Sequence, residues 1–247
     1  PDVIESAPGT HPTPRASEDI DVYALTHNET STGVAMELNR PAPGIVVVDG
    51  TSAAGALGFD TADVDVYYFS TQKAFGADGG LWAALLSPAA IERIEQIAAS
   101  GRHIPAFLSL SDALANSRRD QTINTPSLVT LFLLERQIEW IRSNGGMEWS
   151  GRHCRAMSSM LYEWAEHRDY ASPFVADPAM RSPVTVTIDL TVDAAKVSEV
   201  LRDNGIVDTE SYRKLGRNQL RIGVWPATDQ EDVQRLITCV DYVVERL

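Results

Sequence analysis

A continuous run of β-branched residues at Ile45–Asp49 restricts the possible folds of this chain more than any other stretch. The run reads IVVVD and is apolar at four successive positions. A strand with one solvent-exposed face would instead alternate between apolar and polar residues. Unalternated strands of this kind are typical of parallel sheets that are buried on both faces. The run therefore indicates an α/β domain, and its last residue places a carboxylate at a strand end.

The rest of the first half supplies the other elements of such a domain. Strands are predicted where β-branched, aromatic or apolar residues gather, at 20–25, 65–69 and 81–86. Ser87-Pro88 has the features of a helix N-cap followed by an N1 proline. A longer apolar helix is predicted over 126–143, and a Gly-Gly pair ends it. We therefore expect a large α/β domain over residues 1–146.

Residues 147–247 alternate again between helical and extended patterns and predict a smaller C-terminal α+β domain. The expected helices cover 149–167, 193–204 and a final segment that reaches 247. The expected strands cover 184–190, 206–209 and 219–224. The sequence from Thr228 to Glu231 has the form of a capping box and is expected to open the last helix.

Composition argues against several classes of protein. The chain has 247 residues, of which 44% are hydrophobic and 22% charged, as in a soluble globular protein. Its net charge of −13 argues against a nucleic-acid partner, because no basic field would attract phosphates. No apolar run approaches the roughly 18 residues that span a bilayer, so no membrane insertion is expected. Cys154 and Cys239 lack metal-ligand spacing and indicate reduced thiols in a cytoplasmic protein without a metal site.

The N-terminal segment has the composition of an internal loop. It reads PDVIESAPGTHPTPR, is rich in proline, and does not resemble a signal peptide. Because it begins with loop residues and without Met, we expect the chain to be the C-terminal portion of a longer protein.

The loop STQKAFGADGG at residues 70–80 is the main candidate for chemistry. It connects two predicted buried strands, so Lys73 lies at a strand end, where open α/β sheets place their ligands. A lysine held there by hydroxyls and glycines is suited to imine formation with a carbonyl compound. The alternative interpretation is a surface lysine in a polar loop, because lysines are usually exposed.

Three polar residues end or follow predicted strands in the first half, namely Thr30, Asp49 and Lys73. An electron-sink cofactor such as pyridoxal phosphate needs a lysine for its Schiff base and a carboxylate that keeps the pyridine nitrogen protonated. A hydroxyl near the ring oxygen would tune the imine. Each residue has a structural alternative, since strand-end Asp often forms a turn and Thr30 could act as a cap. The three residues in this order indicate such a cofactor site more specifically than any one of them does alone.

The order of several motifs resembles that of the phosphoserine aminotransferase family, which belongs to class V of the fold-type I pyridoxal phosphate enzymes. The motifs are HNETSTG, VVVDGTSAAG, STQKAFGADGGLW, INTPS and GIVDTESYRKLGRNQLR. The resemblance covers essentially the whole chain. It implies a large cofactor-binding domain, built mainly from a parallel sheet with helices, and a smaller C-terminal domain.

The resemblance also implies roles for the matching positions around the cofactor. Lys73 would hold the cofactor and carry protons, Asp49 would contact the pyridine nitrogen, and Thr30 would lie near the phenolic oxygen. Gln72 would contact the cofactor phosphate.

Substrate binding is implied at the basic segment before the last helix. Arg221 matches the arginine that binds the substrate α-carboxylate in a bidentate manner, a task that lysine cannot copy. Arg213 lies in the segment that binds the substrate phosphate, although the family's His-Arg pair is replaced here by Tyr212-Arg213. Lys214 and Arg217 are alternative ligands of this anion.

Asn124 and Thr125 match the pair that reaches the cofactor phosphate of a neighbouring subunit, which implies a homodimer with shared active sites. The family's Gly-rich turn, the aromatic residue that stacks on the cofactor and a further His-Arg anion site have no match in this chain. The five tryptophans are better explained as core residues. The chain is therefore expected to hold the lysine and the electron-sink carboxylate but only part of the cofactor site.

The resemblance implies that the full enzyme is a transaminase, which moves an amino group from glutamate to 3-phosphohydroxypyruvate and yields phosphoserine and 2-oxoglutarate, as in serine biosynthesis. Another class-V aminotransferase, of the serine–glyoxylate or alanine–glyoxylate type, is the alternative among enzymes. The basic cluster at 213–217 argues for a phosphorylated substrate. An inactive fragment that serves only folding or dimerisation is the alternative outside the enzymes.

Overall fold

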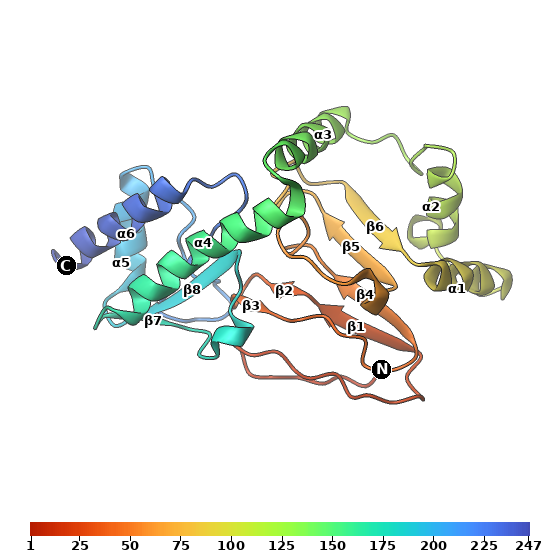
Figure 1. Ribbon diagram of the computed structural model, residues 1–247, viewed down its shortest axis with the longest axis horizontal. Helices are drawn as coiled ribbons and strands as arrows, with labels where there is room; N and C mark the ends of the chain where they lie inside the picture. The colour runs from red at the N-terminus through yellow and green to blue at the C-terminus, as the bar shows by residue number, and fades with distance from the viewer.

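The computed structural model describes residues 1–247 and arranges them in two units, each with its own sheet and helices (Figure 1). The larger sheet has four strands in the order β1 (Val22–Thr26), β4 (Ile45–Asp49), β5 (Val66–Ser70) and β6 (Trp82–Leu86). The first three strands are parallel, and β6 is antiparallel to β5. This arrangement confirms the predicted α/β class with a mainly parallel sheet.

The strand β4 lies inside this sheet, as its composition predicted. Val46 and Val48 are buried and pack with Tyr67 of β5 in one hydrophobic cluster. Ile45 and Val47 point to the opposite face, because side chains alternate along a strand, and they are only half-buried. The expectation of two fully covered faces is therefore wrong for this strand, since none of the chain's helices packs closely on it.

The helices of the large unit follow β6. They are α1 (Pro88–Ala99), α2 (Leu110–Ser117) and α3 (Leu128–Ser143). The predicted cap of α1 is confirmed, because the Ser87 hydroxyl accepts a hydrogen bond from the Ala90 amide at 3.1 Å. α3 buries only Thr130 and Ile141, so most of its apolar side chains are at least partly exposed. None of the helices is both long enough and apolar enough to cross a bilayer.

The smaller unit contains an antiparallel sheet with strands β7 (Ala171–Pro173), β8 (Thr185–Leu190) and β9 (Gln219–Gly223). Its helices are α4 (Gly146–Glu166), α5 (Ala194–Asp203) and α6 (Gln230–Val244). A cluster of 19 buried hydrophobic residues, among them Met157, Leu161 and Ile188, forms the core between sheet and helices. The unit has the predicted α+β character, while the boundary at residue 146 stays a prediction.

One predicted strand of this unit, over residues 206–209, does not form. Only Glu210 pairs with the sheet, through an isolated bridge to Leu220. Asp208 has a φ of 63°, which interrupts an extended path. This stretch is therefore a loop along the edge of β9.

The start of the last helix also differs in detail from the capping-box prediction. Asp229 is the N-cap, and its carboxylate accepts a hydrogen bond from the Glu231 amide at 2.9 Å. The Thr228 hydroxyl instead accepts a hydrogen bond from the Trp225 amide at 3.1 Å. Thr228 thus closes the turn between β9 and α6. Three short 3₁₀ helices complete the fold, at Thr61–Asp63, Ala106–Leu108 and Pro178–Met180.

The two units meet along the first half of α4, which reaches from the large sheet to the small one (Figure 1). Small residues of the large unit pack there against Cys154 of α4 and Val184, which precedes β8. The Ser150 hydroxyl donates a hydrogen bond to the Gly55 carbonyl oxygen at 2.5 Å. A buried apolar seam therefore fixes one unit against the other.

Candidate functional site

The carboxyl ends of the parallel strands lie side by side, as the sequence predicted. Thr26 of β1 pairs with Asp49 of β4, which in turn pairs with Tyr68 of β5. The Asp49 carboxylate accepts a hydrogen bond from the Thr51 amide at 2.9 Å, which orients it. Burial, and then the charge of Asp49, raise the pKa of the Tyr67 phenol. This edge of the sheet thus holds an oriented carboxylate beside a neutral phenol.

Lys73 follows β5 in a loop that buried contacts hold in place. The Thr71 hydroxyl donates a hydrogen bond to the Asp78 carbonyl oxygen at 2.8 Å, which closes the loop. Ala74 packs against Gly55, where an added Cβ would lie 3.1 Å from the Ala74 Cβ and where φ is +88°. The backbone of Lys73 is therefore fixed, while its side chain remains half-buried.

A short hairpin carries Thr30; its strands are β2 (Asn28–Glu29) and β3 (Val34–Ala35). Gly33 in its turn has a φ of +74°, and a Cβ there would lie 2.7 Å from Thr187 Oγ1 and 2.8 Å from the Thr185 carbonyl oxygen. The Thr187 hydroxyl donates a hydrogen bond to the Thr32 carbonyl oxygen at 2.7 Å. The hairpin therefore docks directly on β8 and brings Thr30 to the space between the two sheets.

A cavity of about 700 Å³, called here the lysine cavity, brings Thr30 and Lys73 together with Arg221 of β9. Its volume is typical of small-molecule sites. Thr185 and Trp225 also line it, and the Lys73 ammonium lies 5.9 Å from the centre of a Trp225 ring. Burial, and then the positive charge of Arg221, lower the pKa of Lys73. A lowered pKa increases the fraction of free amine, which is the form that attacks a carbonyl carbon.

Four of the predicted cofactor-binding residues do not line the lysine cavity. Asp49 lies at the strand end described above. Gln72 is exposed, and so are Asn124 and Thr125 in the connection between α2 and α3. The cofactor roles of these four residues stay predictions.

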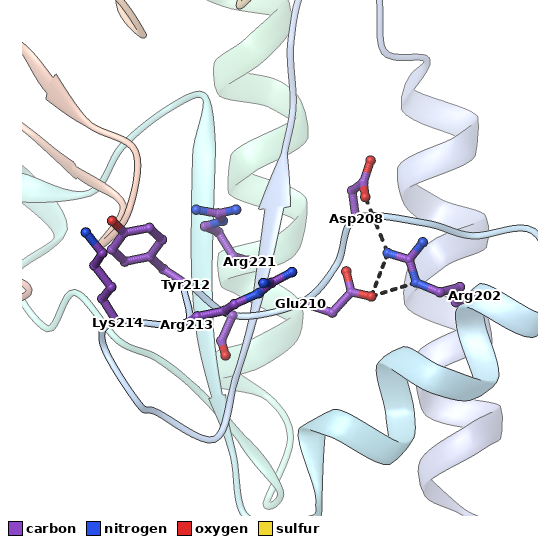
Figure 2. Close-up of a pocket in the computed structure, with 8 residues that line it drawn as sticks. Arg202, Asp208, Glu210, Tyr212, Arg213, Lys214 and Arg221 are labelled. Atoms are coloured by element: carbon purple, nitrogen blue, oxygen red, sulfur yellow. Dashed lines mark hydrogen bonds and ion pairs between the residues drawn. The ribbon is translucent and has the colours of Figure 1, made fainter.

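A second cavity, of about 760 Å³, shares Arg221 with the lysine cavity and is lined mainly by charged residues (Figure 2). We call it the charged cavity. Arg213 and Lys214 line it together with Tyr212, whose ring centre lies 5.8 Å from the Arg221 guanidinium carbon. Neither Arg213, Lys214 nor Arg221 forms an ion pair. The charged cavity can therefore bind an anion without breaking a salt bridge.

Arg217, an alternative ligand of that anion in the sequence, is occupied elsewhere. Its Nε donates a hydrogen bond to the Asp189 carboxylate at 3.0 Å, and its guanidinium lies over the Phe174 ring at 4.4 Å. Arg217 does not line the charged cavity. Arg213 and Lys214 are therefore the cations of residues 213–217 that line the charged cavity, and which of them would bind the anion stays a prediction.

The expectation that all five tryptophans are core residues is wrong. Trp164 is buried, but Trp82 is 55% exposed and Trp225 lines the lysine cavity. Sequence reasoning missed Trp225 because it reaches Lys73 only after the small sheet has docked on the large one. Thr185 was missed for the same reason, and no local pattern distinguishes it from other strand residues.

The donor set around the lysine cavity fits the cofactor that the sequence resemblance implies. Thr185 Oγ1, in the lining of this cavity, is buried and has no hydrogen-bond partner in the chain, which is uncommon for a buried polar atom. Its hydroxyl can both donate and accept a hydrogen bond. The chain would hold pyridoxal phosphate through the Lys73 amine, the Thr30 hydroxyl and the Asp49 carboxylate.

Comparison with known proteins identifies the class. The family model described as aminotransferase class-V matches residues 13–236, which is most of the chain. This match agrees with the parallel sheet and with the lysine at its edge. The chain belongs to the class-V aminotransferases, which use pyridoxal phosphate.

Particular relatives are similar to the whole chain. The putative phosphoserine aminotransferase of Mycobacterium avium (strain 104) is 55% identical over 252 residues, which cover 100% of this chain and 67% of the relative. The phosphoserine aminotransferase of Rhodococcus jostii (strain RHA1) is 52% identical, with 100% of this chain and 68% of the relative covered. The crystal structure of a phosphoserine aminotransferase from Cytophaga hutchinsonii shares the fold at 24% identity, with a TM-score of 0.88 over 96% of this chain and 68% of that chain. The chain thus spans about two thirds of the length of these proteins.

Proposed function

We propose that this chain carries out pyridoxal phosphate-dependent transamination between glutamate and 3-phosphohydroxypyruvate, which yields O-phosphoserine and 2-oxoglutarate for serine biosynthesis. The observation that carries the proposal is the position of Arg221, which lines both cavities. An amino acid held by its α-carboxylate at Arg221 would direct Cα toward Lys73 and its side chain toward Arg213 and Lys214. The names of the relatives at 52% and 55% identity support the same substrate.

The charged cavity suits both amino donors of this reaction. Phosphoserine ends in a phosphate and glutamate in a γ-carboxylate, so each presents an anion at the far end from its α-carboxylate. One cationic cavity can therefore receive the two donors in turn, as a ping-pong reaction requires. In a chain of net charge −13, unpaired cations gathered in one cavity favour this use over a general basic surface.

At the lysine cavity, the chain's own residues would divide the work. Bound pyridoxal phosphate supplies the electron sink that makes the Cα proton of an amino acid acidic. Lys73 would hold the cofactor and carry the proton to and from Cα, which its lowered pKa favours. Asp49 would keep the ring nitrogen protonated, and Thr30 would donate a hydrogen bond to the phenolic oxygen. Arg221 would fix the α-carboxylate through two parallel hydrogen bonds.

We also infer a homodimer with shared sites. Asn124 and Thr125 precede α3, on which Leu128 is 75% and Phe132 is 57% exposed. An apolar helix face exposed to this extent is typical of a protein interface. A second copy packed on α3 would bring Asn124 and Thr125 to the partner's cofactor phosphate, where Gln72 would be a further ligand.

The alternatives account for fewer of these features. A glyoxylate-type aminotransferase acts on a small neutral side chain and has no use for unpaired cations such as Arg213 and Lys214. A unit that serves only folding has no use for a lysine of lowered pKa beside an unpaired Arg221. The two cavities together favour a phosphorylated amino acid.

The test compares two arginine variants of the holoenzyme. Arg213→Ala removes a charge-assisted hydrogen bond worth about 1.5–3 kcal/mol, so kcat/KM for phosphoserine should fall roughly 10- to 100-fold. The value for alanine should change little, because alanine has no distal anion. Arg221→Ala should lower kcat/KM for phosphoserine, glutamate and alanine alike, because all three share the α-carboxylate. Steady-state kinetics with the three donors measures both effects.

Arg217→Ala is the matched control from the same segment, because this arginine pairs with Asp189 outside the charged cavity. It should leave the preference among donors unchanged. A preference for phosphoserine that survives Arg213→Ala would contradict the assignment of the distal anion to the charged cavity. Equal activity of the wild type toward alanine and phosphoserine would favour the glyoxylate type instead.

A further inference from the structure

The charged cavity contains two carboxylates that the binding of an anion does not explain. Asp208 and Glu210 line the same space as Arg213, Lys214 and Arg221 (Figure 2). Carboxylates at this position would repel a phosphate dianion. They would also compete with that phosphate for the guanidinium of Arg213.

Arg202, on α5, binds both carboxylates. Its Nε donates a hydrogen bond to Glu210 at 2.8 Å, and its Nη2 donates to Asp208 at 3.3 Å. Figure 2 shows the Glu210 side chain between Arg202 and Arg213, joined by dashed lines to Arg202 alone. With four cations and two carboxylates, the lining of the cavity carries a net charge of +2. Arg202 thus pairs with both carboxylates, offsets one of their two negative charges and leaves the other cations unpaired.

The backbone keeps Glu210 within reach of both arginines. The Arg221 amide donates a hydrogen bond to the Thr209 carbonyl oxygen at 3.0 Å, and Glu210 forms its bridge with Leu220. The main chain of Glu210 is therefore anchored to the strand that carries Arg221. Only its side chain is free to turn, and its two cationic neighbours are Arg202 and Arg213.

Charge effects agree with this placement. Despite burial, the pKa of Glu210 is lowered by the hydrogen bond from Arg202 and also by the charge of Arg213. Glu210 therefore stays ionised and is attracted by both arginines. Arg202 holds it because only Arg202 contacts it directly.

We propose that Arg202 is a positioning residue that sets the preference for a phosphorylated substrate, because it holds Glu210 and Asp208 away from Arg213. This inference rests on the proposed function. With Arg202 in place, the guanidinium of Arg213 stays free for the distal anion of the substrate. Without Arg202, the Glu210 side chain turns to Arg213, forms an internal ion pair and competes with the substrate.

The exposure of these groups argues that they do little for the stability of the fold. The side chains of Arg202 and Glu210 are each 46% exposed, and that of Asp208 is 89% exposed. Ion pairs at such exposed positions contribute little to stability. Variants at these positions should therefore fold, and an unchanged thermal midpoint would verify that they do.

The experiment is a double-mutant cycle in the holoenzyme with Arg202→Gln, Glu210→Gln and the combined variant. Arg202→Gln should lower kcat/KM for phosphoserine about tenfold, the equivalent of one charge-assisted hydrogen bond, and leave alanine unaffected. Adding Glu210→Gln should restore kcat/KM for phosphoserine to within about threefold of the wild-type value, because a neutral amide competes weakly with the substrate for a guanidinium. The inhibition constant of inorganic phosphate against phosphoserine should rise and recover in parallel.

Two further variants serve as controls. Arg202→Lys keeps the positive charge and should retain most of the preference for phosphoserine over alanine. Arg93→Gln breaks an exposed ion pair with Asp21 in the large unit and should leave kcat/KM for both donors unchanged. If Arg202→Gln lowers kcat/KM for alanine and phosphoserine equally, Arg202 only supports the loop and the inference is wrong. The inference is also wrong if adding Glu210→Gln does not restore kcat/KM for phosphoserine. A wild-type enzyme without preference for phosphoserine would contradict the proposed function, and the inference with it.

Discussion

At the scale of single residues, the surroundings of Lys73 distinguish it from the other lysines of the chain. It is half-buried, faces Trp225 and shares a cavity with the unpaired Arg221. Burial and a positive neighbour both destabilise its ammonium form. Lys196 and Lys214, the remaining two lysines, lie outside that cavity.

This difference predicts the result of chemical trapping. Borohydride reduction of the protein loaded with pyridoxal phosphate should attach the cofactor covalently to Lys73 alone, because only this amine combines a lowered pKa with access to the cavity. Peptide mass spectrometry locates the modification, and Lys196 and Lys214 are internal controls. Cofactor bound to Lys214 with Lys73 unmodified would contradict the assignment.

At the scale of elements, the position of Thr30 depends on a hairpin that cannot be stable alone. Each of its strands has two residues, and an isolated two-stranded hairpin is marginal even when longer. Its turn is held by β8, where Gly33 lies against Thr187. One side of the lysine cavity thus depends on contacts with the other unit of the molecule.

Gly33→Ala should therefore destabilise the protein by about 1–3 kcal/mol, because alanine is strained at positive φ and its Cβ would overlap the neighbouring strand. Urea denaturation measures the change in the free energy of unfolding. Gly58→Ala is the matched control, since Gly58 has no positive φ and an added Cβ meets nothing within 4 Å. Equal stability of the two variants would contradict close docking of the hairpin on β8.

Elements whose signal is local could be predicted from the sequence. The strand Ile45–Asp49 and the cap at Ser87 each depend on a few adjacent residues, and the structure confirms both. The strand-end positions of Asp49 and Lys73 follow from the parallel order of the sheet, so they could also be predicted. Local composition is enough to predict the strand and the helix cap. The rule that the carboxyl ends of parallel strands lie at one edge of a sheet is enough to predict the two strand-end residues.

Features that depend on distant partners could not be predicted. Arg217 was grouped with Arg213 because they are close in sequence, but its partner Asp189 lies on a different strand. Trp225 was assigned to the core because nothing local shows that it faces Lys73. The first outcome is decided by the pairing of β8 with β9, and the second by how the two sheets pack. Periodicity encodes neither.

At the scale of the whole molecule, most of the exposed large apolar residues belong to the large unit. Phe107, Leu128 and Phe132 are more than half exposed, at 82%, 75% and 57%. Figure 1 shows α3 at the edge of the molecule, where it meets the start of α4 through Trp140 and Trp149. This surface is where we expect the second copy.

Phe132→Asp should therefore convert the proposed dimer to a monomer, because a carboxylate buried in an apolar interface has no partner. Sedimentation velocity measures the oligomeric state. Tyr242→Asp on α6 is the control, since Tyr242 is 58% exposed but lies in the small unit. A Phe132→Asp variant that stays dimeric would place the interface elsewhere.

The hydrogen bond from Thr187 to Thr32 also sets an order of events during synthesis. Its two residues are 155 positions apart, so the hairpin leaves the ribosome long before β8 exists. At roughly 5–20 residues per second, that interval lasts about 8–30 seconds. Throughout it, the turn that carries Thr30 has no sheet on which to dock. Every nascent chain therefore passes through a stage in which the parallel sheet can form but the lysine cavity cannot.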